Sequence, residues 1–204
     1  MKRLSLSLAC LLVALCGVLF LRGEAPLGAA PAPKLASAVF AGGCFWCTES
    51  DFDHMPGVVS TTSGYSGGRV ANPTYEQVSA GGTGHYEAVK VVYDPARISY
   101  RSLTARFFKT VDAVDGGGQF CDRGSQYRSA IFVATPEQRR IAEEVKARAS
   151  ALLKKPVATL ILPAAPFYAA EGYHQDYYRK NPVRYRYYRW RCGREARLKE
   201  LWGG

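Results

Sequence analysis

The sequence lacks the ligand pairs that a zinc site requires. Its one C-x-x-C motif runs from Cys44 to Cys47, and there is neither a second C-x-x-C nor an H-x₃-H elsewhere in the chain. A structural zinc ion takes four ligands, which such sequences supply as two pairs. We therefore expect no metal site, and we expect no other cofactor.

Charged residues are also scarce, at 22% of the chain against 48% hydrophobic residues. This balance excludes a disordered protein, and 204 residues suffice for one domain with a proper core. The net charge of +10 is concentrated near the C-terminus, where residues 179–199 hold nine Lys or Arg and a single acid, Glu195. The body of the domain is therefore close to neutral.

The first 22 residues have the pattern of an export signal. A basic start precedes an uncharged, largely apolar run over residues 4–21. A run of that length fits either a cleaved signal peptide or a short membrane anchor. We expect residues 1–22 to direct export, residues 23–36 to form an Ala/Pro linker and residues 37–204 to form the folded domain. The protein is then periplasmic, or anchored in the membrane and facing the periplasm.

Alternating strand and helix patterns predict a single α+β domain. A short strand leads through two glycines into a helix over 44–54, and period-two alternation marks a strand over 86–93. Further strands are expected at 38–41, 58–64, 126–134 and 157–162, and further helices after Ser99 and over 135–153. We expect a two-layer α/β sandwich with a ferredoxin-like sheet core. Residues 163–204 show little periodicity and predict a long irregular C-terminal segment that wraps over the sheet.

Cys44 stands where a reactive thiol would be useful. The turn made by Gly42 and Gly43 places it in the first turn of the expected helix, where free backbone N–H groups and the helix dipole favour a thiolate. Cys47 lies one helical turn further on and can reach it. The pair predicts a nucleophilic or redox role rather than two buried structural cysteines.

Six short motifs outline a site around this thiol. They are Gly43-Cys44-Phe45-Trp46, Gly64-Tyr65-Ser66-Gly67-Gly68, Asn72-Pro73-Thr74-Tyr75, Gly84-His85-Tyr86-Glu87-Ala88, Gln126-Tyr127-Arg128-Ser129 and His174-Gln175. In this order they are similar to the A-type peptide methionine sulfoxide reductases, over roughly residues 38–182. Each motif alone is weak, but six in order are very specific. The resemblance implies a thiol-dependent reductase of methionine-S-sulfoxide, free or in proteins, that repairs oxidised exported proteins.

The resemblance also implies a role for each polar side chain. Cys44 attacks the sulfoxide sulfur, and Glu87 protonates its oxygen. Tyr75 and Tyr127 donate hydrogen bonds to that oxygen, and Asp122 holds the polar side of the pocket through water. Burial among aromatic residues should raise the pKa of Glu87 and keep it protonated near neutral pH.

Phe45 and Trp46 would form the apolar pocket for the substrate's S-methyl group. Attack then releases methionine and leaves a sulfenic acid on Cys44, which a second thiol condenses with to give an intramolecular disulfide. A thioredoxin-like dithiol protein would supply the electrons.

The cysteines depart from the family pattern. The family more often has Gly at Cys47 and Asn at Cys121, and its usual resolving cysteine lies in a glycine-rich tail that this chain lacks. We expect Cys47 to be the resolving residue, because one helical turn fixes its distance from Cys44, with Cys192 as the second choice. Cys121 and Cys192 could also pair as a structural staple or relay oxidation outward.

Two other functions remain open from the sequence. One is a general dithiol–disulfide oxidoreductase using Cys44 and Cys47, which would have no need for Glu87 and the two tyrosines. The other is a membrane-tethered basic binding module whose cysteines are all structural. The Tyr/Arg-rich stretch over 179–199 could contact anionic lipid, but an exported protein seldom meets nucleic acid. We expect a monomer that binds no nucleic acid.

Overall fold

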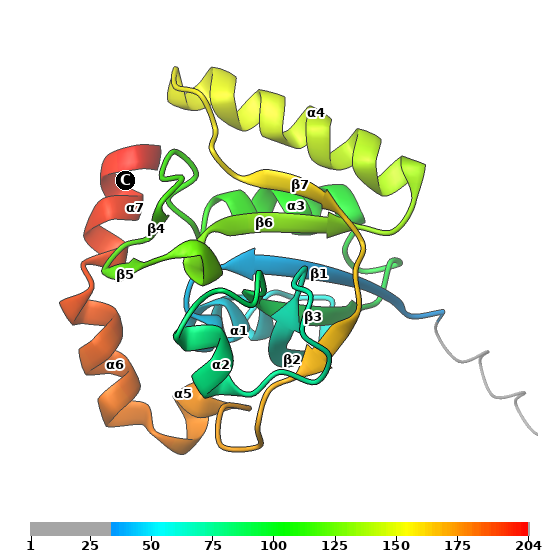
Figure 1. Ribbon diagram of the computed structural model, residues 1–204. Helices are drawn as coiled ribbons and strands as arrows, with labels where there is room; N and C mark the ends of the chain where they lie inside the picture. The colour runs from blue at the N-terminus through cyan, green and yellow to red at the C-terminus, as the bar shows by residue number, and fades with distance from the viewer. Residues whose placement is uncertain (1–33, 204) are drawn as a thin grey trace, which may run out of the picture. The chain divides into compact units, whose positions relative to one another are not determined.

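The computed structural model describes residues 34–203 (Figure 1). The expected signal peptide or anchor, and almost all of the expected linker, lie outside this range. Within it, no helix combines the length and apolarity needed to cross a membrane.

A six-stranded mixed sheet forms the centre of the fold. Its strands are β1 (Ala36–Gly42), β2 (Val58–Ser66), β3 (Tyr86–Tyr93), β6 (Ser129–Val133), β7 (Leu160–Pro163) and β8 (Phe167–Ala169). They lie in the order β7-β6-β1-β3-β2-β8, and all neighbours are antiparallel except β6 and β7. Two short strands, β4 (Gly118–Gln119) and β5 (Asp122–Arg123), form a separate hairpin. The α+β class is confirmed.

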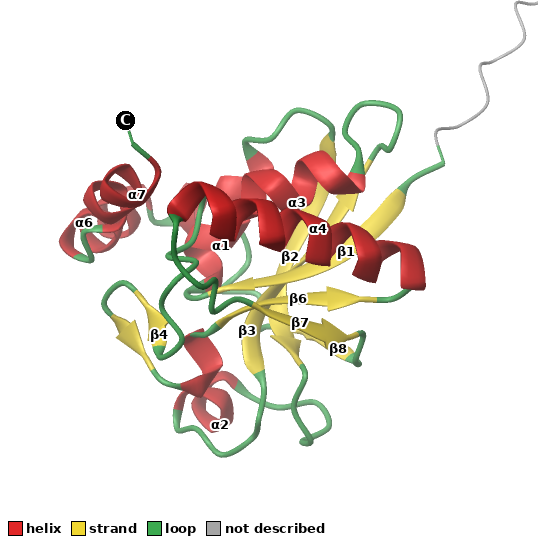
Figure 2. Ribbon diagram, turned by 90° about the horizontal axis from the view of Figure 1, so that it is seen from above, coloured by secondary structure: helices red, strands yellow, loops and turns green. Residues whose placement is uncertain are grey.

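Within residues 34–203, seven helices surround this sheet. They are α1 (Phe45–Asp53), α2 (Tyr75–Ser79), α3 (Tyr100–Phe108), α4 (Pro136–Leu153), α5 (Tyr177–Lys180), α6 (Pro182–Arg191) and α7 (Arg194–Trp202). Of these, α1, α3 and α4 pack against the sheet. The main core joins Val89 and Val91 of β3 to Phe52 of α1, Phe107 of α3 and other buried side chains. Figure 2 shows α3 and α4 side by side.

The two faces of β3 divide as the period-two pattern predicts. Val89 and Val91 join the core beneath the helices, whereas Tyr86 and Ala88 join a smaller cluster on the other face with Phe132. Glu87 shares the face of Val89. Its carboxyl group is therefore directed toward α1 and the buried side of the molecule.

Local capping signals predicted the long helix well. Thr135 accepts a hydrogen bond from the backbone of Gln138, and α4 begins at Pro136 as expected. The strand expected at 126–134 is shorter, because its first residues form a 3₁₀ turn over Ser125–Tyr127 and β6 begins at Ser129.

The prediction of an irregular C-terminal segment was wrong. Residues 163–203 contain β8, α5, α6 and α7, and the three helices follow one another along one side of the molecule in Figure 1. The helices show little apolar periodicity because polar contacts hold them in place. Tyr185 is the one buried residue of α6, and Arg189 of the same helix forms an ion pair of 2.7 Å with Asp51 of α1. Arg194, only 2% exposed, donates to the carbonyl oxygen of Thr110 at 2.7 Å.

Candidate active site

A glycine turn places Cys44 at the start of α1. Gly43 has a φ of +80°, and a Cβ there would lie 2.5 Å from the Cβ of Gln119, so only glycine fits. Cys44 is the N-cap residue, and its carbonyl oxygen accepts the backbone N–H groups of Cys47 and Thr48 at 3.1 and 3.2 Å. Its side chain is buried, with 6% exposed.

A cavity of about 80 Å³ opens beside this thiol. It is lined by Cys44, Phe45, Trp46, Tyr75, Glu87, Asp122, Tyr127 and Tyr188. All seven residues that the resemblance assigns to catalysis or substrate binding therefore lie together. The space suits one small group, since pockets for drug-sized ligands are several times larger. The sequence did not predict Tyr188.

Glu87 is positioned by the first turn of α1. Its Oε2 accepts the backbone N–H of Phe45 at 3.0 Å, and its side chain is 2% exposed. Burial raises the pKa of Glu87 to about 8, although the hydrogen bond from Phe45 opposes that rise. The carboxyl group is therefore mostly protonated at neutral pH and can donate a proton into the cavity.

The two predicted phenols come from separate segments. Tyr75 begins α2, and its backbone N–H donates to Oε1 of Glu171 at 2.8 Å, while the other oxygen of Glu171 accepts the hydroxyl of Tyr65 at 2.8 Å. Tyr127 ends the 3₁₀ turn before β6. Burial is the largest cause raising the pKa of both Tyr75 and Tyr127, with the nearby Glu87 carboxyl adding to it. Both phenols keep their protons and remain hydrogen-bond donors.

The apolar wall is fixed through His174. The indole Nε1 of Trp46 donates to Nδ1 of His174 at 3.0 Å, and the Trp46 ring stacks on Tyr177 with centroids 3.7 Å apart. Burial lowers the pKa of His174, which keeps the ring neutral and leaves Nδ1 free to accept. This contact explains the place of the His174-Gln175 motif in the sequence pattern.

Asp122 closes the polar side of the cavity with a partner from α6. Its carboxylate accepts a hydrogen bond from the hydroxyl of Tyr188. Burial raises the pKa of Asp122, while this hydrogen bond and the charge of Arg194 lower it. Neither Tyr188 nor Glu171 belongs to a recognised motif. Tyr188 lies in the Tyr/Arg-rich stretch, for which we expected a cover over the sheet or a contact with anionic lipid but no part in the active site.

The four cysteines of the described domain fall into two pairs. Cys121 and Cys192 form a disulfide that links the residue before Asp122 to the end of α6. Cys44 and Cys47 are both free and buried. Cys121 and Cys192 therefore pair with each other, as in the structural disulfide that we considered from the sequence. Cys47 remains as a free thiol three residues from Cys44.

The helix tip alone does not make Cys44 a thiolate. Burial raises the pKa of Cys44 well above its ordinary value, and the neighbouring Cys47 and Glu87 add to the rise. The expectation of a thiolate considered the helix dipole and left out desolvation, which is the largest of the causes that raise this pKa. A hydrogen bond from Cys44 lowers the pKa of Cys47, and the guanidinium charges of Arg194 and Arg189 contribute.

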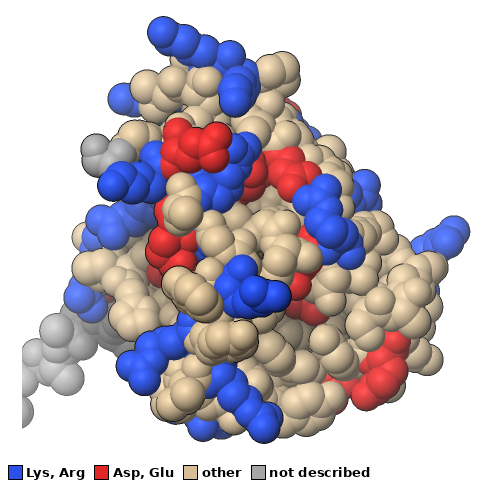
Figure 3. Space-filling model, turned by 90° about the vertical axis from the view of Figure 1, so that its left-hand side faces the viewer, with Lys and Arg blue, Asp and Glu red and all other residues tan. Residues whose placement is uncertain are grey.

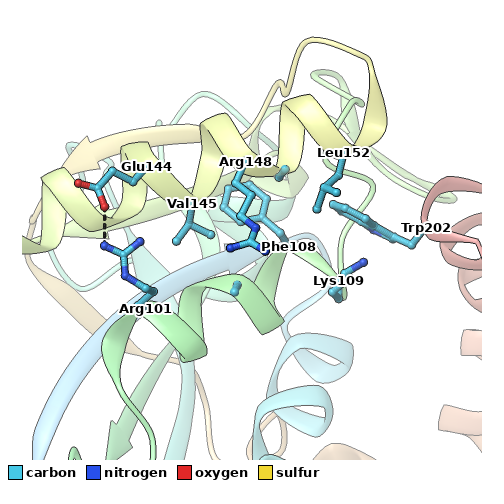
Figure 4. A pocket seen from close by; sticks show the side chains of 10 residues that line it. Arg101, Phe108, Lys109, Glu144, Val145, Arg148, Leu152 and Trp202 are labelled. Carbon is cyan, nitrogen blue, oxygen red and sulfur yellow. Dashed lines mark hydrogen bonds and ion pairs between the residues drawn. The ribbon is translucent and has the colours of Figure 1, made fainter.

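A larger cavity of about 300 Å³ lies away from this site, between α3, α4 and α7 (Figure 4). Phe108, Val145, Leu152 and Trp202 line it, and an ion pair between Arg101 and Glu144 stands at its edge. No cysteine, histidine or tyrosine is among its lining residues. It holds no group suited to thiol chemistry, so the smaller cavity is the candidate active site.

Comparison with known proteins agrees with this choice. The family model described as peptide methionine sulfoxide reductase matches residues 36–204. Peptide methionine sulfoxide reductase MsrA 2 of Caulobacter vibrioides is 54% identical over 192 residues, which cover 92% of this chain and 97% of that protein. The structure of Mxr1 from Saccharomyces cerevisiae in reduced form has a TM-score of 0.69 and 32% identity, over 75% of this chain and 88% of that one. Mxr1 in complex with Trx2 shares the fold, with a TM-score of 0.50 and 24% identity over 72% and 87% of the two chains. The chain thus belongs to the A-type peptide methionine sulfoxide reductases and is an oxidoreductase.

Proposed function

We propose that this enzyme reduces the S epimer of methionine sulfoxide, free or in proteins, with Cys44 as the nucleophile. One observation carries the proposal: a buried thiol, a buried protonated carboxyl group and two phenols line a single cavity of about 80 Å³. A sulfoxide needs this combination, because its sulfur becomes a good target for a thiol only when the oxygen is protonated or strongly hydrogen-bonded.

In the first step, Sγ of Cys44 takes the oxygen of the substrate. Tyr75 and Tyr127 donate to the sulfoxide oxygen. Glu87 supplies a proton to that oxygen and takes up in return the proton that Cys44 gives up. The S–O bond of the substrate breaks, and a new S–O bond forms between this oxygen and Sγ of Cys44, which becomes a sulfenic acid. The substrate is reduced to methionine, and Cys44 is oxidised by the same two electrons.

In the second step, Cys47 condenses with the sulfenic acid. A new bond joins the sulfur atoms of Cys44 and Cys47, and the oxygen leaves as water. Two features support Cys47 as the resolving residue. It lies one turn from Cys44 in α1, and its lowered pKa favours the thiolate that attacks. The Cys121–Cys192 disulfide leaves neither partner with a thiol for this role.

A thioredoxin-like dithiol protein then reduces the Cys44–Cys47 bond. The complex of Mxr1 with Trx2 supports this donor class by analogy. A general dithiol–disulfide oxidoreductase is the weaker alternative, because its reaction would not require the protonated Glu87 or the two phenols.

We further propose that the enzyme acts on oxidised exported proteins, in or facing the periplasm. The basic and apolar start of the sequence supports export, and a disulfide such as Cys121–Cys192 persists in an oxidising compartment. Cell fractionation and N-terminal sequencing of the mature protein would test both points.

The sheet topology supports the expected ferredoxin-like core. The strands β6-β1-β3-β2 lie in this order and are antiparallel, and α1 and α3 form the crossover connections.

Turnover of separate S and R epimers with a dithiol reductant tests the reaction. We expect the wild type to consume the S epimer only and Cys44→Ser to consume neither. Equal rates for the wild type and Cys44→Ser would refute the assigned nucleophile, and equal rates for both epimers would refute the stereochemical assignment.

A further inference from the structure

One side of α6 faces the active site, and the other side is bare. On the inner side, Tyr185 is buried, Tyr188 lines the cavity and Arg189 pairs with Asp51. On the outer side, Val183, Tyr187 and Trp190 are 70%, 61% and 71% exposed. The rings of Tyr187 and Trp190 lie 6.0 Å apart.

The exposed surface of α6 also carries positive charge that no acid within the described part of the chain neutralises. Arg184, Arg186 and Arg191 are exposed, and none of them has an ion pair or side-chain hydrogen bond within residues 34–203. Elsewhere arginines such as Arg101, Arg140 and Arg197 do pair with acids. Figure 3 views this side of the molecule and shows Lys and Arg side chains projecting from it.

Two of these arginines lie on the helix surface between Tyr188 and the exposed Tyr187. Residues three and four positions apart share a face of a helix, so Arg184 and Arg191 flank Tyr188, whose side chain forms part of the cavity wall. Arg186 lies about 160° around the helix from Tyr188, at 3.6 residues per turn. The surface next to the cavity therefore continues through Arg184 and Arg191 to the exposed ring of Tyr187.

The composition of this surface fits recognition of a peptide. Arginine and tyrosine are enriched at protein interfaces, where tyrosine adds contact area at a low cost in conformational entropy. The outer side of α6 contains no acid, and in the chain the run from Arg179 to Arg194 contains none. A partner with complementary charge is acidic.

We propose that Arg184, Arg191 and Tyr187 dock acidic residues that flank an oxidised methionine in a protein substrate. This inference rests on the proposed function and names the class of substrate that the same site prefers. A helix of ten residues is about 15 Å long, so about four residues of an extended chain can lie along it. A methionine sulfoxide inserted beside Tyr188 then brings its neighbouring residues within reach of both arginines.

The test compares peptide S-sulfoxides that differ only in their flanks. One peptide has two aspartates on each side of the oxidised residue, and the other has two lysines on each side. N-acetylmethionine-S-sulfoxide, which has no flanks, is the third substrate. Dithiothreitol serves as reductant, so that docking of a protein donor does not enter the rates.

For the wild type, we expect kcat/KM to be roughly tenfold higher for the acidic peptide than for the basic one at low salt. The ratio should approach one in about 1 M salt, where the Debye length falls to about 3 Å. Arg184→Glu/Arg191→Glu should reverse the preference. Arg186→Glu makes one such charge change on the same helix but away from the cavity, and it should keep the wild-type preference.

Any of the following results would contradict the proposal that Arg184 and Arg191 dock acidic flanking residues. Equal ratios in the wild type and the double variant would show that the two arginines do not select flanks. Loss of activity on N-acetylmethionine-S-sulfoxide in the double variant alone would place them in the catalytic machinery instead. Co-sedimentation of the wild type with phosphatidylglycerol vesicles, lost in the double variant, together with equal peptide rates would assign the surface to lipid. If the wild type fails to reduce even N-acetylmethionine-S-sulfoxide, the proposed function itself is wrong.

Discussion

The hydroxyl of Tyr188 donates a hydrogen bond to the carboxylate of Asp122, although 66 residues separate the two in the sequence. This bond ties α6 to the hairpin of β4 and β5 at the edge of the active-site cavity. The Cys121–Cys192 disulfide ties the same two segments covalently, one residue before Asp122 and four after Tyr188. The wall of the cavity formed by Asp122 and Tyr188 therefore depends on a long-range contact that no local sequence pattern predicts.

Tyr188→Phe removes this hydrogen bond and leaves the ring in place. A hydrogen bond to a charged group contributes about 1.5–3 kcal/mol, so we expect kcat/KM for the S-sulfoxide to fall roughly tenfold or more. Steady-state kinetics would measure the fall. Tyr187→Phe makes the same change at an exposed position of α6 and should leave the rate on the unflanked substrate unchanged. A Tyr188→Phe enzyme as active as the wild type would show that the bond does not support the site.

Cys47→Ser separates the two steps of the reaction. Without reductant, the wild type should release one methionine per enzyme and lose two titratable thiols, because a disulfide forms between Cys44 and Cys47. Cys47→Ser should release the same single methionine and lose only the thiol of Cys44, which remains a sulfenic acid. Peptide mass mapping would identify the bond in the wild type. A Cys44–Cys192 bond there would contradict the order of resolving residues proposed above.

The pH profile should report the protonation of Glu87. Its pKa of about 8 means that the proton is present below that pH and is lost above it. We therefore expect kcat/KM to fall as the pH rises through about 8. Glu87→Gln keeps an acceptor for the Phe45 amide but has no proton to give, so its rate should be lower by roughly 10²–10⁴-fold. If the residual rate of Glu87→Gln falls over the same pH range, another group controls the profile.

Loss of the Cys121–Cys192 disulfide should weaken the fold more than the chemistry. Its partners are 71 residues apart, and the loop it closes corresponds to about 4 kcal/mol of unfolding free energy by chain entropy. We expect Cys121→Ser/Cys192→Ser to unfold at lower urea concentration but still to release one methionine in a single turnover. Unfolding curves and a methionine assay on the same sample would compare the two effects. Failure of single turnover in the folded variant would give this disulfide a part in the chemistry.

The parts of the molecule that local sequence describes were predicted well. The capping Thr135 sets the start of α4, and period-two alternation sets the two faces of β3. The order of the motifs also predicted that Cys44, Glu87 and the two phenols lie at one site. Their positions in the chain alone do not show that four separate segments meet at one cavity.

The parts that long-range polar contacts hold were missed. Helix α6 has an inner side of phenol and guanidinium groups, and its contact with Asp51 of α1 cannot be read from spacing. Glu171 was missed for the same reason, because its role is to hold Tyr65 and Tyr75 from a distant loop. The raised pKa of Cys44 depends on how tightly the cavity closes over it, which only the packed structure reveals.

The backbone N–H of Phe45 points at Glu87 rather than at the sulfur beside it. When that acid releases its proton, the anion that remains already has a hydrogen-bond donor and the positive end of α1 next to it. The enzyme thus solvates the charge that the reaction creates with a dipole that was oriented during folding. Water does not have to enter the cavity and reorganise around the new carboxylate.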